Sequence, residues 1–340
     1  EIGVRLVGSE MCIRDRYDPD ADCPRWRTFI TEIMQGDKAR ADYLQKAIGY
    51  SLTGDTRMEC LFILYGPTSR NGKGTTMESI LRIMGEYGKN ADPTMLQAKF
   101  NSQSGGPSEE IARLAGSRFV NISEPEKKIT LDAALTKRLT GNDTITARYL
   151  HENSFEFRPN FKIFINTNHR PNITDLTLFE SGRIKIIPFD RHFEENEQDK
   201  DLKSTFAKPE NMSGILNWML EGYKLFRSQG LAMPDSVVQA TTDYQIFSDK
   251  MGQFFDECIE EKEGCELRRG AVYTRYKEWC GENGYRAEAA KNLNQEIEKR
   301  YKTARKRPND GASSSTTPMV LDVAFTASEE SKEDFAPLTS

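Results

Sequence analysis

Long hydrophobic runs are absent from this chain. No stretch of its 340 residues approaches eighteen consecutive apolar positions, and no secretory signal pattern is present. The six cysteines form no C-x-x-C pair and lie far in sequence from the three histidines, which argues against structural zinc and for reduced thiols. These absences argue against membrane insertion and secretion, and we expect a cytoplasmic protein.

A clear excess of positive charge is also lacking, since the formal net charge is −5. This value weakens the case for general nucleic-acid binding. The charge is unevenly spread, however. Residues 299–307, KRYKTARKR, carry six positive side chains and no negative one, whereas the tail after Pro308 is acidic and rich in serine and threonine. A local basic patch matters more than the mean.

The composition, with 37% hydrophobic and 29% charged residues, is that of a globular chain with room for two or three domains. The chain does not begin with methionine, and residues 1–16, EIGVRLVGSEMCIRDR, show no clear period and resemble translated sequencing-adapter sequence. We exclude these residues from the fold and expect the natural protein to extend upstream.

The most informative stretch is residues 61–76, LFILYGPTSRNGKGTT. An apolar run typical of a buried parallel strand breaks into a glycine-bounded loop, and helical spacing follows. The inward N–H groups of such a loop and the positive end of the helix dipole bind phosphate oxygens. We expect an ATP site in which Lys73 reaches the β- and γ-phosphates and Thr75 holds Mg²⁺. The expected nucleotide-binding residues are Gly66, Asn71, Gly72, Lys73, Gly74, Thr75 and Thr76.

The loop departs from the G-x-x-x-x-G-K-[ST] pattern. Five residues rather than four separate Gly66 from Gly72, and Gly74 stands where the hydroxyl should be. Thr75 or Thr76 is therefore the candidate magnesium ligand, and a lysine followed by Gly-Thr is similar to the loop of nucleoside monophosphate kinases. The alternative is an unliganded glycine-rich surface turn, which needs neither a buried strand before it nor a lysine at this spacing.

Three further strands are predicted at residues 118–123, 161–167 and 183–189, with helical or turn-rich segments between them. Strands that alternate with helices predict a three-layer α/β domain. Before this domain, apolar positions at three- and four-residue spacings predict a helical hairpin over residues 24–53.

Helices are also predicted after the α/β domain. Residues 213–228 and a helical stretch from Pro234 to about residue 261 are expected to form a lid and linker. Two helices and a basic β-hairpin at residues 302–325 then follow in the order of a winged helix.

Polar side chains follow the predicted strands at the sheet edge where open α/β sheets bind ligands. Glu124 is the candidate for polarising the attacking water, with Glu126 as a competitor. Asn168, which shares a face with Asn166, can donate to the γ-phosphate or to the lytic water. Arg183 can donate to the charge that develops on a neighbouring subunit's γ-phosphate. The plainer alternatives are a solvated glutamate, a turn-forming asparagine and a surface arginine.

Together these segments resemble the superfamily 3 helicase domain of the phage and plasmid primase-helicase family, which is related to the poxvirus primase-helicase. The matching segments are LYGPTSRNGKGT, RFVNISEPE, LTKRLTGNDTITARYLHENSFEFRPNFKIFINTNHRP and GRIKIIPF. The resemblance covers residues 18–301 and implies an AAA+-like ATPase that forms a hexameric ring and moves along single-stranded DNA. It implies that Lys73 and Thr75 bind nucleotide and that Glu124 is the acidic catalytic residue and a magnesium ligand. It also implies that Asn168 is the γ-phosphate sensor and Arg183 an arginine finger in trans.

Two hairpins are candidate DNA contacts. Residues 144–157, TITARYLHENSFEF, alternate and turn at Glu152 and Asn153, and in the resembled helicases a hairpin at this place grips single-stranded DNA in the central channel. The C-terminal basic hairpin suits duplex DNA. The expected DNA-binding residues are Lys137, Arg138, Arg148, His151, Arg305, Lys306 and Arg307. A plain surface hairpin and a solvated charged face are the alternatives.

The sequence therefore predicts an ATP-driven DNA helicase module of a phage or plasmid replication protein in the bacterial cytoplasm, with any primase portion upstream. The competitors are a nucleotide kinase and a DNA-binding initiator or loader that uses ATP only for assembly. The predicted parts are an artefact or disordered segment (1–16), an N-terminal helical region (17–57), a P-loop ATPase core (58–192), a helical lid and linker (193–262), a winged-helix-like DNA-binding domain (263–326) and a disordered tail (327–340).

Overall fold

The computed structural model describes residues 17–98, 109–123, 129–306 and 316–326. The chain divides into two compact units, unit 1 (Glu1–Ser248) and unit 2 (Asp249–Ser340). Within the described ranges, no helix has the length and apolar character needed to cross a membrane.

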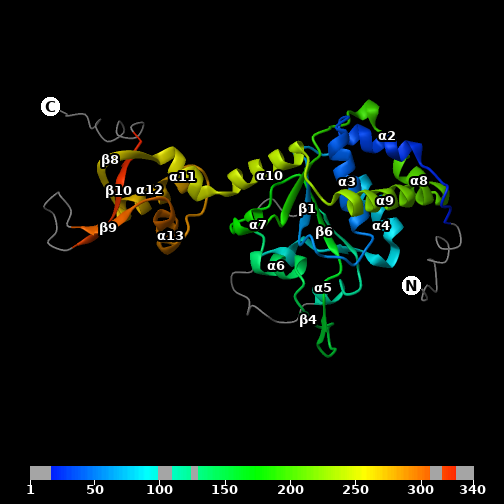
Figure 1. Cartoon of the computed structure of the whole chain (residues 1–340), viewed down its shortest axis with the longest axis horizontal. Helices are drawn as coiled ribbons and strands as arrows, with labels where there is room; N and C mark the ends of the chain where they lie inside the picture. The colour runs from blue at the N-terminus through cyan, green and yellow to red at the C-terminus, as the bar shows by residue number, and fades with distance from the viewer. Residues whose placement is uncertain (1–16, 99–108, 124–128, 307–315, 327–340) are drawn as a thin grey trace. The chain divides into compact units, whose positions relative to one another are not determined.

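Unit 1 is built on a parallel five-stranded sheet of order β2-β3-β6-β1-β7 (Figure 1). In that order the strands are Gly88–Ala91, Phe119–Ser123, Lys162–Thr167, Leu61–Tyr65 and Ile184–Pro188. The central strand β1 pairs with β6 and β7, and every residue of β6 is buried. Such continuous burial is expected of a parallel strand that is covered on both faces. The predicted α/β class with a parallel sheet is confirmed.

Alternate residues of β1 enter two separate cores, because successive side chains of a strand point to opposite faces. Phe62 and Leu64 pack into one core, and Leu61 and Ile63 into the other. The first core also takes side chains from α2 (Pro24–Ile33), α3 (Lys38–Tyr50), α4 (Lys73–Met84), α8 (Leu202–Phe206) and α9 (Pro209–Gln229). The second takes them from α6 (Ala133–Thr140), α7 (Thr177–Glu180) and α10 (Asp235–Ser248). The short helix α5 (Glu109–Ala112) precedes β3.

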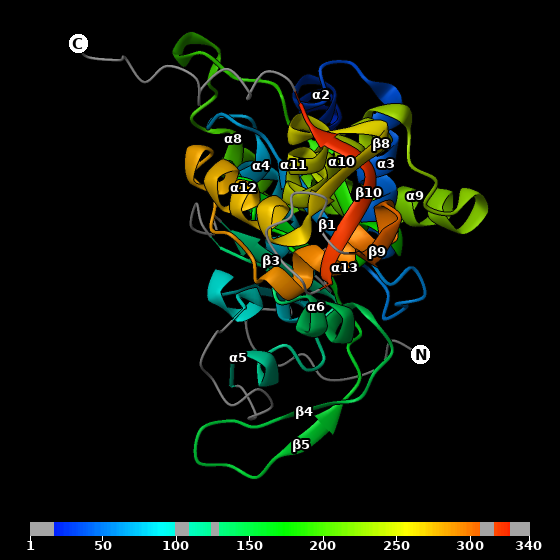
Figure 2. The same cartoon turned by 90° about the vertical axis from the view of Figure 1, so that its left-hand side faces the viewer.

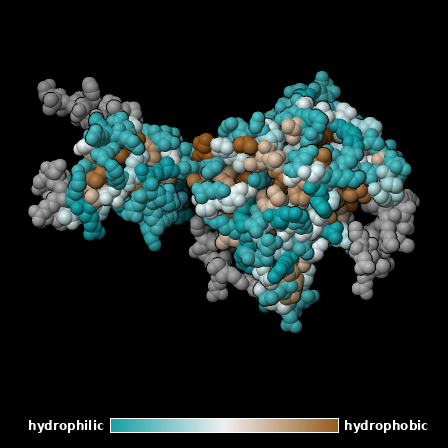
Figure 3. All heavy atoms as spheres, in the orientation of Figure 1, coloured by the Kyte–Doolittle hydropathy of each residue, from teal (hydrophilic) through white to brown (hydrophobic). Residues whose placement is uncertain are grey.

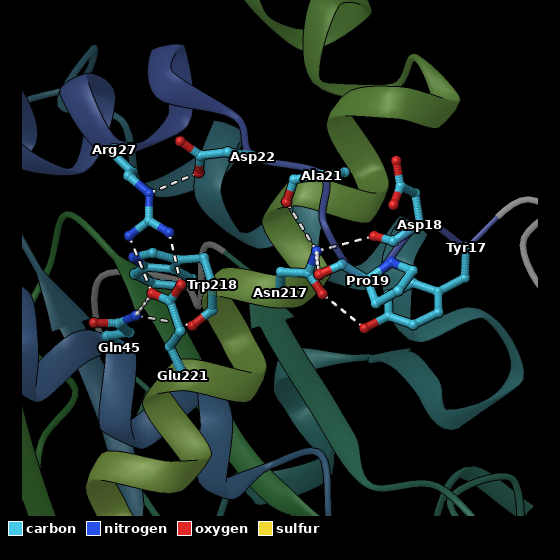
Figure 4. A network of polar contacts seen from close by, with 10 residues as sticks. All are labelled: Tyr17, Asp18, Pro19, Ala21, Asp22, Arg27, Gln45, Asn217, Trp218 and Glu221. Atoms are coloured by element: carbon cyan, nitrogen blue, oxygen red, sulfur yellow. Dashed lines mark hydrogen bonds and ion pairs between the residues drawn. The ribbon is translucent and has the colours of Figure 1, made fainter.

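The predicted helical hairpin, α2 and α3, is bound closely to α9. Gly49 of α3 and Gly222 of α9 allow this approach, since a Cβ atom on Gly222 would lie 2.2 Å from the Gln45 carbonyl oxygen. Figure 4 shows the polar contacts beside this crossing: Arg27 of α2 donates to Glu221 of α9 at 2.8 Å, and Gln45 donates to the Trp218 carbonyl. The N-terminal helical region and α9 therefore form one packed layer.

Helix α10 covers the edge strand β7. The Ile186 N–H of β7 donates to the Thr241 hydroxyl of α10 at 3.1 Å, which occupies a backbone donor that an edge strand would otherwise leave open for pairing. The outer face of α10 exposes Val238, Ile246 and Phe247, and Figure 3 shows hydrophobic atoms over this helix.

Unit 2 has its own core. Its elements are α11 (Lys250–Cys258), β8 (Ile259–Arg268), α12 (Arg269–Glu282), α13 (Ala290–Arg300), β9 (Thr303–Lys306) and β10 (Thr317–Phe325), with antiparallel strand order β8-β10-β9. Buried Phe254, Tyr276, Trp279 and Ile297 belong to the same cluster. The predicted order of two helices and a basic hairpin is present as α12, α13, β9 and β10, and its assignment as a winged helix stays a prediction.

The prediction of one helical stretch from Pro234 to about residue 261 is wrong in one respect. Asp249 separates α10 from α11, and its side chain caps α11 by accepting from the Gly252 N–H at 2.7 Å. The chain then enters β8, which is paired with β10 from Ile259 onward. Because Phe254 and Phe255 of α11 pack in the unit 2 core, the division between units falls before α11, not at residues 262 and 263.

A lysine is buried at the amino end of β6. Lys162 is 2% exposed, its ammonium lies 4.3 Å from the centroid of the Tyr50 ring, and it donates to the Thr53 carbonyl. Burial disfavours the charged form and lowers the pKa of Lys162 to about 7, against an opposing effect of Asp55.

This burial predicts a pH-dependent stability. Between about pH 7 and the ordinary lysine pKa of 10.5, the unfolded chain binds a proton that the folded chain does not, so the contribution of Lys162 to the free energy of unfolding rises with pH. We take the free energy of unfolding of Lys162→Met minus that of wild type. This difference should be larger at about pH 6 than at about pH 9.5, by roughly 1–5 kcal/mol. Urea unfolding at both pH values measures the difference. A pH-independent difference would show that Lys162 keeps its ordinary pKa.

Candidate functional site

The glycine loop predicted to bind phosphate connects β1 to α4 at the carboxyl edge of the sheet. The Gly66 N–H donates to the Thr167 carbonyl at 3.3 Å, which ties the start of the loop to the end of β6. A Cβ atom on Gly66 would lie 2.3 Å from the Phe189 carbonyl oxygen and 2.4 Å from Asn71 Nδ2. Gly72 caps α4 with a φ of 86°, a conformation that glycine adopts readily. Both glycines are therefore required by the geometry of this loop.

Lys73 is the first residue of α4 and lies under this loop. It is 3% exposed, and its ammonium donates to the Gly66 carbonyl at 3.2 Å and to Asn168 Oδ1 at 2.7 Å. The structure thus brings together the loop lysine and the asparagine that sequence analysis assigned to one phosphate site. Asn168 directly follows β6, and Lys73 follows the loop after β1, so both lie at the carboxyl edge of the sheet, where open α/β sheets bind ligands.

A hollow of about 240 Å³ opens beside the loop, and we call it the phosphate-loop hollow. It is lined by Ser69, Arg70, Asn71, Gly72, Lys73, Gly74, Thr75, Asn166, Asn168 and Lys203. Arg70 and Lys203 were missed by the sequence analysis. Arg70 lies inside the loop motif, and its basic charge was the available signal. Lys203 belongs to α8, where its ammonium contacts Glu78 of α4 at 2.6 Å, and no motif marks it.

The structure separates the two threonines that were candidates for Mg²⁺. Thr76 is fully buried, and its hydroxyl donates to the carbonyl of Gly72, the residue that caps α4, at 3.0 Å. Thr75 lines the phosphate-loop hollow. A hydroxyl is an oxygen ligand of the kind that Mg²⁺ takes together with phosphates, so Thr75 fits the assignment better. In the described part of the chain, no three His, Cys, Asp or Glu side chains cluster to form a metal site by themselves.

The acidic residue predicted to polarise water, Glu124, and its competitor Glu126 lie outside the described residues. The strand that precedes them is described as far as Ser123, which is the register partner of Asn166 on β6. The end of β3 therefore adjoins the strand that carries Asn168.

Arg183 directly precedes β7 and so lies at the amino edge of the sheet, opposite the carboxyl edge that carries the phosphate loop. Its carbonyl accepts from the Leu61 N–H at the start of β1, whereas the phosphate loop follows the end of β1. Its guanidinium contacts Glu59 Oε2 at 2.7 Å and the Thr140 hydroxyl at 2.9 Å. Arg183 thus lies at the opposite end of β1 from the loop, and its predicted role in trans stays a prediction.

The predicted hairpin is present as β4 (Ile145–Ala147) and β5 (Phe155–Phe157), and Figure 2 shows it extending from the body of unit 1. Arg148 and His151 are exposed in its connecting loop, where Leu150 is 68% exposed and His151 has a φ of 63°. The structure therefore places these two predicted DNA contacts in one loop.

The other predicted DNA contacts are dispersed. Lys137 and Arg138 lie on α6 rather than on the hairpin, and Lys137 contacts Asp175 at 2.9 Å. In unit 2, Arg305 and Lys306 lie on β9, where Lys306 pairs with Glu266 of β8 at 2.5 Å. Arg307 lies outside the described residues.

The fold and loop define a mixed α/β protein that carries a strand, a glycine loop and a helix on the carboxyl edge of a parallel sheet. Comparison with protein families adds two matches. Residues 247–327 match the Poxvirus D5 protein-like family, and residues 64–183 match a family of unknown function. The predicted resemblance to the poxvirus primase-helicase is confirmed by the first match.

Curated relatives come from viruses with DNA genomes and a virophage. "Putative helicase L207/L206" of Acanthamoeba polyphaga mimivirus is 28% identical over 75% of this chain, and "Putative helicase 022R" of Frog virus 3 (isolate Goorha) is 26% identical over 75%. "Putative helicase V13" of Sputnik virophage is 24% identical over 63% of the chain. This chain spans 28%, 28% and 29% of their respective lengths.

Solved structures of the C-terminal region of NrS-1 share the fold. The apo structure of residues 305–718 of that protein has a TM-score of 0.54 and 12% identity, and the match covers 90% of this chain and 78% of the other. At this identity the comparison shows the fold alone.

The loop geometry predicts opposite effects of two glycine substitutions. Gly66→Ala must displace the Phe189 carbonyl or Asn71, and we expect a loss of about 1–3 kcal/mol of stability. Gly74→Ala is the matched control, because no atom lies within 4 Å of its added Cβ and alanine favours the helix. Thermal unfolding of both variants measures the effect. Equal melting temperatures would contradict the steric role of Gly66.

Proposed function

We propose that this chain is the ATP-dependent DNA helicase module of a replication protein, which hydrolyses ATP with Mg²⁺ between subunits of a hexameric ring and moves along single-stranded DNA. One observation carries the proposal: Lys73 at the start of α4 lies between the Gly66 carbonyl and Asn168 at the carboxyl edge of the sheet. The poxvirus-type match and the viral relatives named as helicases support it. Those relatives make a DNA-virus origin as compatible with the chain as a phage or plasmid origin.

The residues of the loop have complementary roles in this proposal. The N–H groups at the start of α4 and the Lys73 ammonium bind the β- and γ-phosphates. Thr75 supplies a hydroxyl to Mg²⁺, which neutralises charge on the phosphate oxygens when it is bound. Asn168 exchanges its contact with Lys73 for one with the γ-phosphate or the attacking water, and Glu124 polarises that water. A neighbouring subunit supplies Arg183 to the transferring phosphoryl group.

Two further parts of the proposal concern DNA. The loop between β4 and β5 presents Arg148 and His151 to single-stranded DNA, for which their exposure is the supporting observation. The basic strand β9 of unit 2, with Arg305 and Lys306, contacts duplex DNA. Lys137 contacts DNA only when its ion pair with Asp175 is broken.

ATP hydrolysis with and without single-stranded DNA tests the function. We expect wild-type protein to hydrolyse ATP faster when DNA is present, and Lys73→Ala to lower the rate roughly a hundredfold or more, because the phosphates lose their buried cation. Hydrolysis that ignores DNA would favour the assembly ATPase instead. Phosphorylation of a nucleoside monophosphate would favour the kinase.

Mixed subunits test the role of Arg183 in trans. Arg183→Ala and Lys73→Ala should each be inactive alone, whereas a mixture should regain hydrolysis at those interfaces that combine an intact Lys73 with a neighbour's intact Arg183. Glu59→Gln is the matched control, since it removes the charge that pairs with Arg183 within the subunit and keeps the guanidinium. A loss in Glu59→Gln as large as that in Arg183→Ala would show that the internal ion pair, and not a finger, is what matters.

A further inference from the structure

The side chain of Arg183 is held by two segments of its own subunit. Its guanidinium donates to Glu59 Oε2 at 2.7 Å and to the Thr140 hydroxyl at 2.9 Å, with a longer contact of 3.4 Å to the Glu59 carbonyl. The Arg183 side chain is 17% exposed. Glu59 belongs to the connection between α3 and β1, whereas Thr140 is the last residue of α6. Both segments therefore enclose a cation that the proposed mechanism needs in a neighbouring subunit's site.

Asn142 joins these two segments directly. The Thr56 hydroxyl donates to Asn142 Oδ1 at 2.8 Å, and Asn142 Nδ2 donates to Glu59 Oε1 over a longer 3.5 Å. An ionised carboxylate only accepts hydrogen bonds, so this orientation of the amide suits both neighbours. The Glu59 carboxylate thus faces Arg183 with one oxygen and Asn142 with the other. We call Glu59 and Asn142 the clamp.

The backbone around the clamp is tightly constrained. Glu59 has a φ of 42°, in the left-handed region. This conformation is uncommon for residues other than glycine and is retained where surrounding contacts hold it. On the other side, a Cβ atom on Gly141 would lie 2.8 Å from the Lys137 carbonyl oxygen and 4.0 Å from Arg183 Nη1. Because hydrogen bonds weaken steeply with distance and angle, a small displacement of either segment breaks the contacts of Arg183.

The clamp adjoins the hairpin that carries predicted DNA contacts. Two residues separate Asn142 from β4, and the loop between β4 and β5 exposes Arg148 and His151. Strand β4 is paired with β5, and its first residue, Ile145, is buried in the second core of unit 1. A ligand that pulls on the exposed loop therefore acts, through a short paired strand, on the residues that hold Arg183.

We propose that the clamp retains Arg183 within its own subunit in the absence of DNA, and that single-stranded DNA bound at the β4–β5 loop displaces residues 140–143 and releases it. This inference rests on the proposed function and deepens it, because it names the contact through which DNA stimulates hydrolysis. Glu59 and Asn142 are positioning residues, since they act on the transferring phosphoryl group only through Arg183. A variant that breaks the clamp should populate the released state with no DNA bound.

Steady-state ATP hydrolysis by the full chain, with and without oligothymidylate, tests the clamp. Glu59→Gln and Asn142→Ala should each raise the DNA-free kcat roughly threefold or more, because a charge-assisted contact or its support is lost. The KM for ATP should stay unchanged, since Arg183 acts in the transition state. Asp143→Asn is the matched control. It removes a charge from the same loop, and within the described residues no hydrogen bond or ion pair joins Asp143 to Arg183 or Glu59.

The outcomes separate this inference from the proposed function. Adding Arg183→Ala to Glu59→Gln should abolish the gain, which shows that the gain passes through the guanidinium. A DNA-free rate at or below wild type in either clamp variant, or a gain that persists without Arg183, overturns the inference. DNA-stimulated hydrolysis that is lost in Lys73→Ala would still support the proposed function in that case. No hydrolysis by wild type with DNA overturns both together.

Discussion

The buried ammonium of Lys73 is the constraint on which the site depends. A charge that is 3% exposed must have partners, because desolvation without compensation is costly. The Gly66 carbonyl and Asn168 Oδ1 are two of them, and they belong to the segments that follow β1 and β6. The lysine thus fixes the distance between loop, helix and sheet edge, and any movement of one segment changes the electrostatics of the others.

The position of Arg183 makes the two ends of strand β1 chemically different. The phosphate loop follows the carboxyl end of β1, and Arg183 adjoins the amino end of the same strand. The chain therefore carries the glycine loop on one edge of its sheet and a cation on the opposite edge. Glu59 holds that cation at 2.7 Å and the Thr140 hydroxyl accepts from it at 2.9 Å, so the role in trans proposed for Arg183 requires the loss of both contacts.

The sequence was informative where burial or backbone geometry restricts residue type. The strands β1, β3, β6 and β7 were located to within one residue, because a strand covered on both faces has a nearly continuous run of apolar residues. The edge strands β2 and β8 carry polar residues, and their pairing depends on distant partners. In the site, the glycines and Lys73 followed from spacing, whereas Lys203 and the Glu59 partner of Arg183 become neighbours of these residues only after folding.

The packing of the N-terminal helices limits where this chain can be cut into a stable fragment. Gly72 of the phosphate loop lies against α2, since a Cβ atom there would approach Ile33 Cγ2 to 2.4 Å and the Phe29 ring to about 3.2 Å. The same helix shares a core with β1 and pairs with α9 through Arg27. A fragment that begins at residue 58 would lose α2 and α3 from one of the two cores and the contact of Gly72 with α2. The smallest self-supporting body that holds the loop therefore begins before α2 and extends through α10, which covers β7.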